Sequence, residues 1–257
     1  MRYEILGPLR VTDGDRASFI SAPKTEQLLA ILLIRSGQVV TIDELIAELW
    51  GDHAPRRAVA GLYVYISQLR KFLLAAGCPQ DPILTRPSGY LMQVGAGELD
   101  FHLFQQLVNT GRLNVKERCF QEAAGSFGRA LSLCRGPLLA SLANGPIGYG
   151  FHAWFSEARL ESEEMFIDAE LQLGHHREVI GQLYSLTSEN SLREAFYHQL
   201  MLALYRCDRQ ADALAVYRRA RQTLNEELGL EPCRALQELH SGILRADPWL
   251  ELEQTVA

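Results

Sequence analysis

The stretch from Pro55 to Leu73, PRRAVAGLYVYISQLRKFL, constrains the fold most because it reads as one amphipathic helix with an unusual outer face. At 100° per residue, four apolar residues fall on one side of the helix, and this side is predicted to pack against a core. The four residues are Leu62, Ile66, Leu69 and Leu73. The opposite side carries small or hydrogen-bonding residues between basic ends: Arg57, Ala60, Gly61, Val64, Ser67, Gln68 and Lys71. Such side chains can address phosphates and base edges. An ordinary surface helix also fits this stretch, so its surroundings must decide.

Two helices are predicted before this stretch and a hairpin after it. The first begins near Pro23 and stops at Gly37, and the second begins at the capping box Thr41-x-x-Glu44. Short strands are predicted at residues 2–6 and 8–11, with a further one beginning at Phe19. A final hairpin, 82–85 and 90–94, turns at Arg86-Pro87-Ser88-Gly89.

This order of elements is that of a winged helix-turn-helix domain. In such a fold the last helix enters the major groove, and the hairpin tip reaches the neighbouring backbone or minor groove. Arg86 lies on the tip, where it either contacts DNA or is simply a polar hairpin residue. The sequence therefore makes the 55–73 helix a candidate recognition helix.

Charge is distributed unevenly along the 257 residues, whose formal net charge is −6. Residues 1–97 hold ten Lys/Arg and nine Asp/Glu, whereas residues 98–257 hold fifteen and twenty-two. Residues 53–90 hold five basic side chains and one acidic side chain, a net charge of +4. Positive charge is thus local to the candidate recognition helix and hairpin, where a phosphate-binding surface needs it.

The second part of the chain, residues 98–257, predicts an all-α domain after a glycine-containing break at residues 95–97. Helices are expected near 101–110, 116–133, 152–173, 176–187, 191–206, 209–228 and 232–246. Similar residues recur 33 positions apart, close to the tetratricopeptide period: Leu171/Leu204, Gly174/Cys207, Ile180/Ala213, Leu183/Val216 and Tyr184/Tyr217. The predicted architecture is mainly α with small β elements, with a winged helix over 1–97 and a tetratricopeptide-like repeat domain over 98–257.

Several classes of protein are disfavoured by the same sequence. No run of about 18 apolar residues or secretion signal is present, and the five widely spaced cysteines suit a reducing cytoplasm. The GxG of Gly145–Gly150 lacks a surrounding phosphate loop, so we expect an ordinary loop there. His175 and His176 are adjacent and project differently, so they do not form a metal pair. We expect no catalysis, no cofactor, no metal and no membrane attachment.

The motifs resemble known families. VYISQLRKFL (64–73), TRPSGY (85–90) and ELIAELWGD (44–52) resemble the OmpR-type winged helix. Residues 191–222, LNEELGLEP (224–232) and ILRADP (243–248) resemble the bacterial transcriptional activation domain. Together, nearly the whole chain resembles the Streptomyces antibiotic regulatory protein (SARP) family. The resemblance implies a cytoplasmic, nucleoid-associated activator that binds tandem direct repeats at promoters of secondary-metabolite gene clusters. It implies head-to-tail protomers on double-stranded DNA and recruitment of RNA polymerase through its sigma factor.

Site residues follow partly from the resemblance and partly from the helical wheel. The family's DNA contacts correspond to Ser67, Gln68, Arg70, Lys71 and, on the wing, Arg86. The wheel independently favours Arg57, Val64, Gln68 and Lys71, and places Arg70 at the flank, in a phosphate-binding or structural role. By resemblance the loop from Trp50 to Pro55, including Asp52 and His53, faces polymerase, although Trp50 equally suits a core anchor.

A second hypothesis concerns the helical repeat domain. Repeat solenoids offer concave binding surfaces. The chain is then a ligand-responsive regulator that senses a small molecule or a peptide through residues 98–257.

Overall fold

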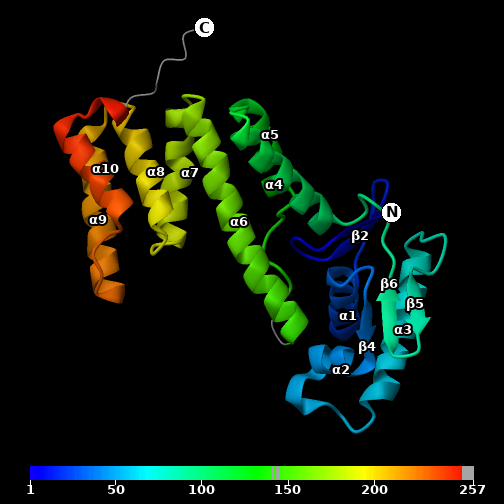
Figure 1. Ribbon diagram of the computed structural model, residues 1–257. Helices are drawn as coiled ribbons and strands as arrows, with labels where there is room; N and C mark the ends of the chain where they lie inside the picture. The colour runs from blue at the N-terminus through cyan, green and yellow to red at the C-terminus, as the bar shows by residue number, and fades with distance from the viewer. Residues whose placement is uncertain (141, 143–144, 251–257) are drawn as a thin grey trace. The chain divides into compact units, whose positions relative to one another are not determined.

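The elements up to residue 92 form a small sheet, three helices and a second sheet (Figure 1). The computed structural model describes residues 1–140, 142 and 145–250. The first sheet has the antiparallel order β1-β2-β3, and the second has the order β4-β6-β5. The bounds in this part are β1 (Arg2–Glu4), β2 (Arg10–Asp13), β3 (Arg16–Ser18), α1 (Pro23–Ile34), β4 (Val39–Thr41), α2 (Ile42–Trp50), η1 (Gly51–His53), α3 (Ala58–Ala75), β5 (Ile83–Arg86) and β6 (Gly89–Met92).

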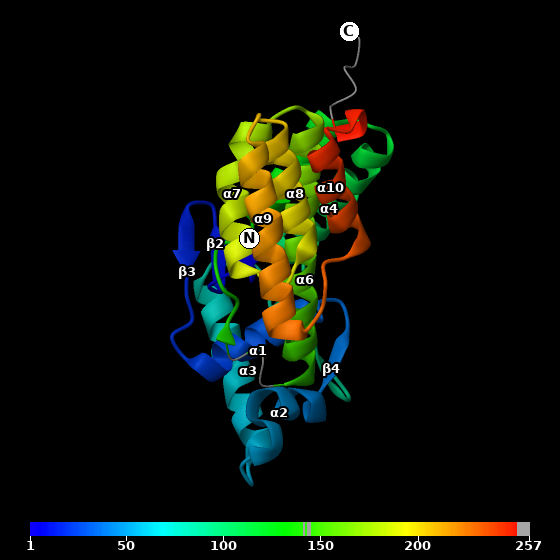
Figure 2. The ribbon, with the colours of Figure 1, turned by 90° about the vertical axis from the view of Figure 1, so that its left-hand side faces the viewer.

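Helices follow from residue 100 onward, as the sequence predicts (Figure 2). Their bounds are α4 (Asp100–Lys116), α5 (Phe120–Ser132), α6 (Pro146–Gln172), α7 (His176–Glu189), α8 (Glu194–Tyr205), α9 (Gln210–Leu228), α10 (Arg234–Arg245) and η3 (Pro248–Leu250). The winged helix followed by an all-α domain is confirmed. Within the described ranges, no helix has the length and apolar character needed to cross a membrane.

Contacts divide the chain into two compact units. The N-terminal unit contains Met1–Asn109 and Arg129–Leu160, and the C-terminal unit contains Thr110–Gly128 and the chain from Glu161 onward. The N-terminal unit thus takes in helical residues beyond position 97 as well as the winged helix. The independence of a domain ending at residue 97 stays a prediction.

The core of the winged helix is built around α1, which packs against α2 and α3. Six of its apolar side chains are fully buried: Leu28, Leu29, Ala30, Ile31, Leu32 and Leu33. A helix that is buried nearly all round belongs to a core and has no wide solvent face. Helix α2 begins at the predicted capping box, in which Thr41 and Glu44 bond reciprocally.

Two boundaries in this part differ from the sequence-based expectation. The third strand is Arg16–Ser18, and Phe19, the predicted start, is 62% exposed. The tight turn through Gly14 and Asp15 pairs Asp13 directly with Arg16, so the strand follows the turn at once. Helix α3 begins at Ala58, because Pro55 belongs to a preceding turn whose carbonyl accepts the Ala58 N–H at 2.9 Å.

The predicted loop at Gly145–Gly150 is also wrong, because these residues enter the first turns of α6. The carboxylate of Glu48, which is fully buried on α2, accepts hydrogen bonds from the Ile147 and Gly148 N–H groups, the second at 3.1 Å. These donors lie at the start of a helix, where backbone N–H groups lack intrahelical partners. Burial raises the pKa of Glu48, whereas the two N–H donors act in the opposite direction. The helix therefore starts earlier because a distant side chain caps it.

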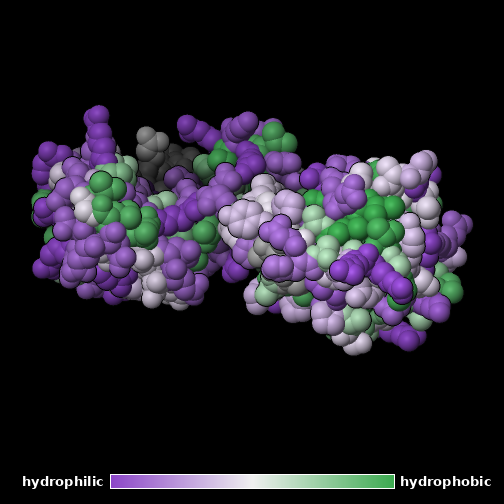
Figure 3. All heavy atoms as spheres, turned by 90° about the horizontal axis from the view of Figure 1, so that it is seen from below, coloured by the Kyte–Doolittle hydropathy of each residue, from purple (hydrophilic) through white to green (hydrophobic). Residues whose placement is uncertain are grey.

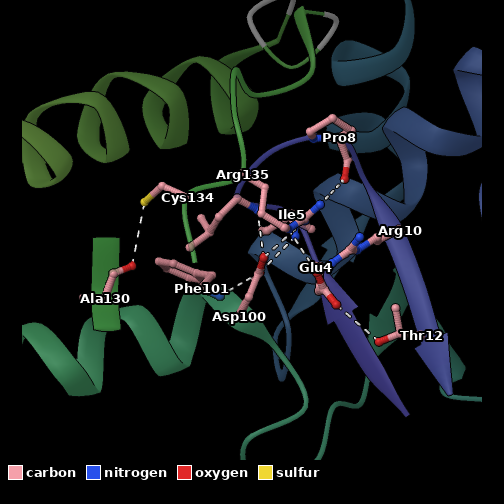
Figure 4. A network of polar contacts seen from close by, with 11 residues as sticks. Glu4, Ile5, Pro8, Arg10, Thr12, Asp100, Phe101, Ala130, Cys134 and Arg135 are labelled. Carbon is pink, nitrogen blue, oxygen red and sulfur yellow. Dashed lines mark hydrogen bonds and ion pairs between the residues drawn. The ribbon is translucent and has the colours of Figure 1, made fainter. Parts of the chain in front are cut away.

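A second polar network joins the first sheet to the segments that follow the winged helix (Figure 4). Buried Asp100 accepts the N–H groups of Ile5 at 2.9 Å and Leu6 at 3.0 Å. Arg135 approaches Asp100 at 3.7 Å, pairs with Glu4 at 3.0 Å and donates to the Pro8 carbonyl at 3.1 Å. Burial raises the pKa of Asp100, and its N–H donors and Arg135 oppose this rise. Residues 100 and 135 are therefore structural parts of the N-terminal unit.

The C-terminal unit is a stack of helices in which α7 packs on α8, α8 on α9, and α10 on both α8 and α9. Leu171 and Leu204 are both buried, as are Leu183 and Val216, in agreement with the 33-residue repeat. The turns differ by one residue. Gly174 has a φ of 84°, and the left-handed residue of the second turn is Asp208, with a φ of 60°, one position after the Cys207 that the repeat aligns with Gly174.

Glu48→Ala is expected to lower the free energy of unfolding by about 2–4 kcal/mol, because it leaves buried N–H groups of α6 unpaired. Urea denaturation followed by tryptophan fluorescence measures this loss. Glu44→Ala, on the same helix, is the matched control and removes only the exposed capping box, at a cost of about 1 kcal/mol. If the two variants lose equal free energy of unfolding, the Glu48 carboxylate contributes no more to stability than an exposed helix cap does.

Candidate nucleic-acid interface

The outer face of α3 is the candidate surface. Its buried stripe is Ala58, Leu62, Ile66, Leu69 and Leu73. The predicted outward residues Val64, Ser67, Gln68 and Lys71 are all exposed, and Val64 is 53% exposed. An exposed valine offers a methyl surface of the kind that contacts the thymine methyl group. Figure 3 shows apolar surface among hydrophilic side chains on the part of the N-terminal unit that holds α2 and α3.

The start of α3 is electropositive. Arg57 is the N-cap residue and, like Arg56, is exposed. The first turn contains no acidic residue, and the Arg57 side chain makes no capping hydrogen bond to it. The aligned peptide dipoles place partial positive charge at this end, and two guanidinium groups add to it. This end of the helix therefore favours an anion such as a phosphate.

Gln68 is positioned by its neighbour on α1. Its Oε1 accepts a hydrogen bond from the Thr25 hydroxyl at 3.2 Å, and Thr25 itself is buried. The amide group is thus oriented by the core of the domain, with its Nε2 donor directed to other partners. A preoriented amide is suited to hydrogen bonds with base edges or phosphates.

Arg70 is occupied by the hairpin. Its Nη2 donates to the Ile83 carbonyl at 2.8 Å and to the Thr85 hydroxyl at 3.1 Å, and its Nε lies 2.7 Å from Asp81. Two of these partners lie on β5 and the third lies just before it, so Arg70 ties α3 to the wing. Of the two roles that the sequence left open for Arg70, the geometry favours the structural one.

The wing holds Arg86 as the last residue of β5, exposed beside the tip of the hairpin. The Ser88 carbonyl accepts the Ile42 N–H at 3.1 Å, which fixes the turn against the start of α2. Gly89 is required by close approach, because a Cβ there would lie 2.0 Å from the Val40 carbonyl oxygen. The tip is therefore held by backbone contacts, while the Arg86 side chain is left exposed.

The residues expected to face polymerase divide into two kinds. Trp50 is half-buried and stacks on Tyr65, with ring centroids 5.9 Å apart. It also lies against Gly61, where an added Cβ would be 3.6 Å from the indole ring. Asp52 and His53 are exposed on η1. Trp50 thus packs as an anchor between α2 and α3, while Asp52 and His53 form an open surface.

Sequence reasoning missed two features of this surface. Tyr63 is 50% exposed and Val59 is 41% exposed, and both lie on the row that continues to Ser67 and Lys71 at four-residue spacing. That spacing was the signal that could have found them. The sequence carried no signal for the Thr25 contact to Gln68, because these residues are 43 positions apart.

Family models match both parts of the chain. Residues 18–92 match the C-terminal domain of transcriptional regulatory proteins, and residues 99–244 match the bacterial transcriptional activator domain. The second match covers more than half of the chain. The winged helix and the helical stack thus each correspond to a known module of transcription regulators.

Individual relatives extend over both modules. Regulatory protein AfsR of Streptomyces griseus is 37% identical over 96% of this chain, which spans 25% of that protein. Regulatory protein DnrI of Streptomyces peucetius is 33% identical over 98% of this chain and 94% of that protein. A solved structure of Mycobacterium tuberculosis EmbR, in complex with a low-affinity phosphopeptide, matches with a TM-score of 0.90 and 33% identity. It covers 96% of this chain and 65% of that one. The chain belongs to the SARP family of transcriptional activators.

Proposed function

We propose that this protein activates transcription by binding promoter DNA through α3 and the β5–β6 wing. The observation that carries the proposal is the exposed outer face of α3, which combines Gln68 and Lys71 with an electropositive start at Arg57. Arg86 supplies a separate cation at the wing tip. Gln68 and Val64 are suited to base edges, whereas the three cations are suited to phosphates.

The binding mode follows from the small number of these contacts. A single winged helix with three or four basic contacts gains limited affinity, which decreases steeply with salt as counterions are released. Two protomers on tandem direct repeats raise affinity and specificity together. Direct repeats require a head-to-tail arrangement, since a two-fold interface produces inverted repeats. The proposed targets are promoters of a secondary-metabolite gene cluster, read in the cytoplasm at the nucleoid.

Activation is proposed to proceed by recruitment of RNA polymerase, including its sigma factor. The exposed η1 residues Asp52 and His53 precede α3 in the chain and are separated from its first residue, Ala58, by residues 54–57. Trp50 supports this surface through its stacking on Tyr65. The helical residues from 98 onward provide further protein surface for such contacts. Catalysis by this chain is no part of the mechanism.

The alternative is a ligand-responsive regulator whose helical repeat domain senses a small molecule or a peptide. It is favoured by a solvent-accessible groove in the C-terminal unit. Under this alternative, binding of the ligand changes the affinity of the protein for DNA. Unchanged DNA binding across candidate ligands that do occupy the groove would argue against it.

Lys71→Ala and Arg86→Ala are each expected to weaken binding to the protein's own promoter DNA by about 3–10-fold at physiological salt. Each also reduces the slope of log K against log salt by about 1, because one phosphate contact is lost. Fluorescence anisotropy with a labelled duplex measures both. Arg218→Ala, which removes an exposed cation from α9, is the control and leaves affinity unchanged. If neither Lys71→Ala nor Arg86→Ala weakens DNA binding, the face proposed to contact DNA is misassigned.

Arg70→Ala is expected to behave differently from its neighbour. The loss of its bonds to the wing lowers the free energy of unfolding by about 1–2 kcal/mol, since the ion pair itself is partly exposed and contributes little. DNA affinity decreases as well, because the wing is less well held. Lys71→Ala reduces DNA affinity with no change in stability. Thermal or urea denaturation beside the anisotropy assay separates the roles, and an unchanged stability of Arg70→Ala would contradict the structural one.

A double variant, Asp52→Ala with His53→Ala, is expected to bind promoter DNA normally and to lose at least about half of its activation. Both side chains are exposed, and neither belongs to α3, whose outer face is proposed to bind DNA. In vitro transcription with purified polymerase, run beside a footprint, measures both properties. Full activation by the double variant would place the polymerase surface elsewhere.

A further inference from the structure

We propose that a groove in the C-terminal unit binds an acidic peptide segment of a partner protein. The groove has a volume of about 1130 Å³ and is lined from the α4–α5 turn, α6, α8 and η3. Its polar lining includes Lys116, Arg118, Asp168, Gln199 and Arg206. All lie within one compact unit. The proposal gives the alternative function a ligand class and does not depend on the DNA contacts of α3.

The charge of the groove is opposite to that of its surroundings. Lys116, Arg118 and Arg206 face a single carboxylate, that of Asp168. The chain from residue 98 onward holds twenty-two acidic and fifteen basic residues, so cations are locally concentrated here. A concave site with one sign of charge focuses potential and attracts ligands of the opposite sign. The groove therefore selects for negative charge in its ligand.

Arg206 is held in position before any ligand arrives. Its Nε donates to the Leu250 carbonyl at 2.8 Å, and its Nη1 donates to the Leu171 carbonyl at 3.5 Å. Burial lowers the pKa of Arg206 from its high ordinary value, but a guanidinium stays protonated at neutral pH. Among the described residues Arg206 has no carboxylate partner, and a partly desolvated cation gains from pairing with an anionic side chain.

One buried acceptor in the lining of the groove, on Gln199, lacks a hydrogen-bond donor among the described residues. Gln199 is 3% exposed, and its Nε2 donates to Asp168 at 2.7 Å and to the Glu164 carbonyl at 2.9 Å. Its Oε1 is buried and accepts no hydrogen bond from the residues that the structure describes. A buried acceptor without a donor is unfavourable by about 1–3 kcal/mol. A peptide backbone that enters the groove brings a series of N–H donors for acceptors of this kind.

The size and openness of the groove favour a peptide over a small molecule. Apolar side chains line it beside the polar ones: Val115, Phe120, Leu202 and Trp249. Trp249 is 58% exposed, and Val115 is 37% exposed. Enclosed small-molecule sites commonly measure about 300–1,000 Å³ and bury most of their ligand. A larger open groove with basic groups and an exposed aromatic ring suits an extended acidic peptide with an apolar anchor.

The test is selection of peptides from a phage-displayed random dodecapeptide library on the full-length protein, without DNA. Enriched peptides are expected to carry more Asp and Glu than the library. Fluorescence anisotropy of a synthetic selected peptide should show affinity at least about tenfold weaker for the double variant Lys116→Glu, Arg118→Glu. Absence of acidic enrichment overturns the proposal, as does equal affinity of this variant. Neither result bears on DNA binding by α3.

Matched controls keep the test specific. The double variant Arg177→Glu, Arg218→Glu makes the same charge change at exposed positions of α7 and α9 outside the groove, and should bind the peptide normally. If the groove variant unfolds by circular dichroism, Lys116→Gln with Arg118→Gln replaces it, with a smaller loss expected. Equal weakening by the control variant would mean that general charge attraction, not the groove, binds the peptide, and would also overturn the proposal.

Discussion

The buried carboxylate of Glu48 is the interaction on which the N-terminal unit depends most. It lies on α2, the helix before α3, and caps the start of α6, about 100 residues later. A buried carboxylate without a hydrogen-bond partner is strongly unfavourable, and so is a buried N–H group without an acceptor. The Glu48 carboxylate and the two N–H groups of α6 are therefore each stable only when paired with the other. The position of α2, and with it the packing of Trp50 against α3, is thereby linked to a helix that follows the winged helix.

Asp100 and Arg135 make the same kind of link at the first sheet. Asp100 pairs with two N–H groups beyond the end of β1, and Arg135 pairs with both Glu4 and Asp100. In both places, acidic or basic groups from one part of the chain satisfy backbone or charged groups of another part. The winged helix is therefore stabilised by residues that belong, by sequence similarity, to the activator domain model over residues 99–244.

The sequence was sufficient to predict features that depend on near neighbours. The two faces of α3, the capping box of Thr41 and the β5–β6 hairpin rest on contacts within a few residues, so periodicity and turn chemistry reveal them. The start of α6 was not predictable, because its cap is a single carboxylate far away in the sequence. The structural role of Arg70 was open for a related reason: the wheel places it at the flank, but only the fold brings Ile83 and Thr85 to its guanidinium.

Adjacent basic residues on one helix can thus have separate roles. Arg70 and Lys71 differ by 100° around α3, enough to turn one side chain toward the wing and the other toward solvent. The proposed DNA contacts use both roles, because a wing not held by Arg70 would place Arg86 over many positions and lose orientational precision. The acidic character of the later residues adds a further constraint, since it opposes nonspecific binding of those residues to DNA. The proposed attraction to DNA phosphates is thereby concentrated at α3 and the wing, and the proposed recognition of promoter sequence depends on that small set of contacts.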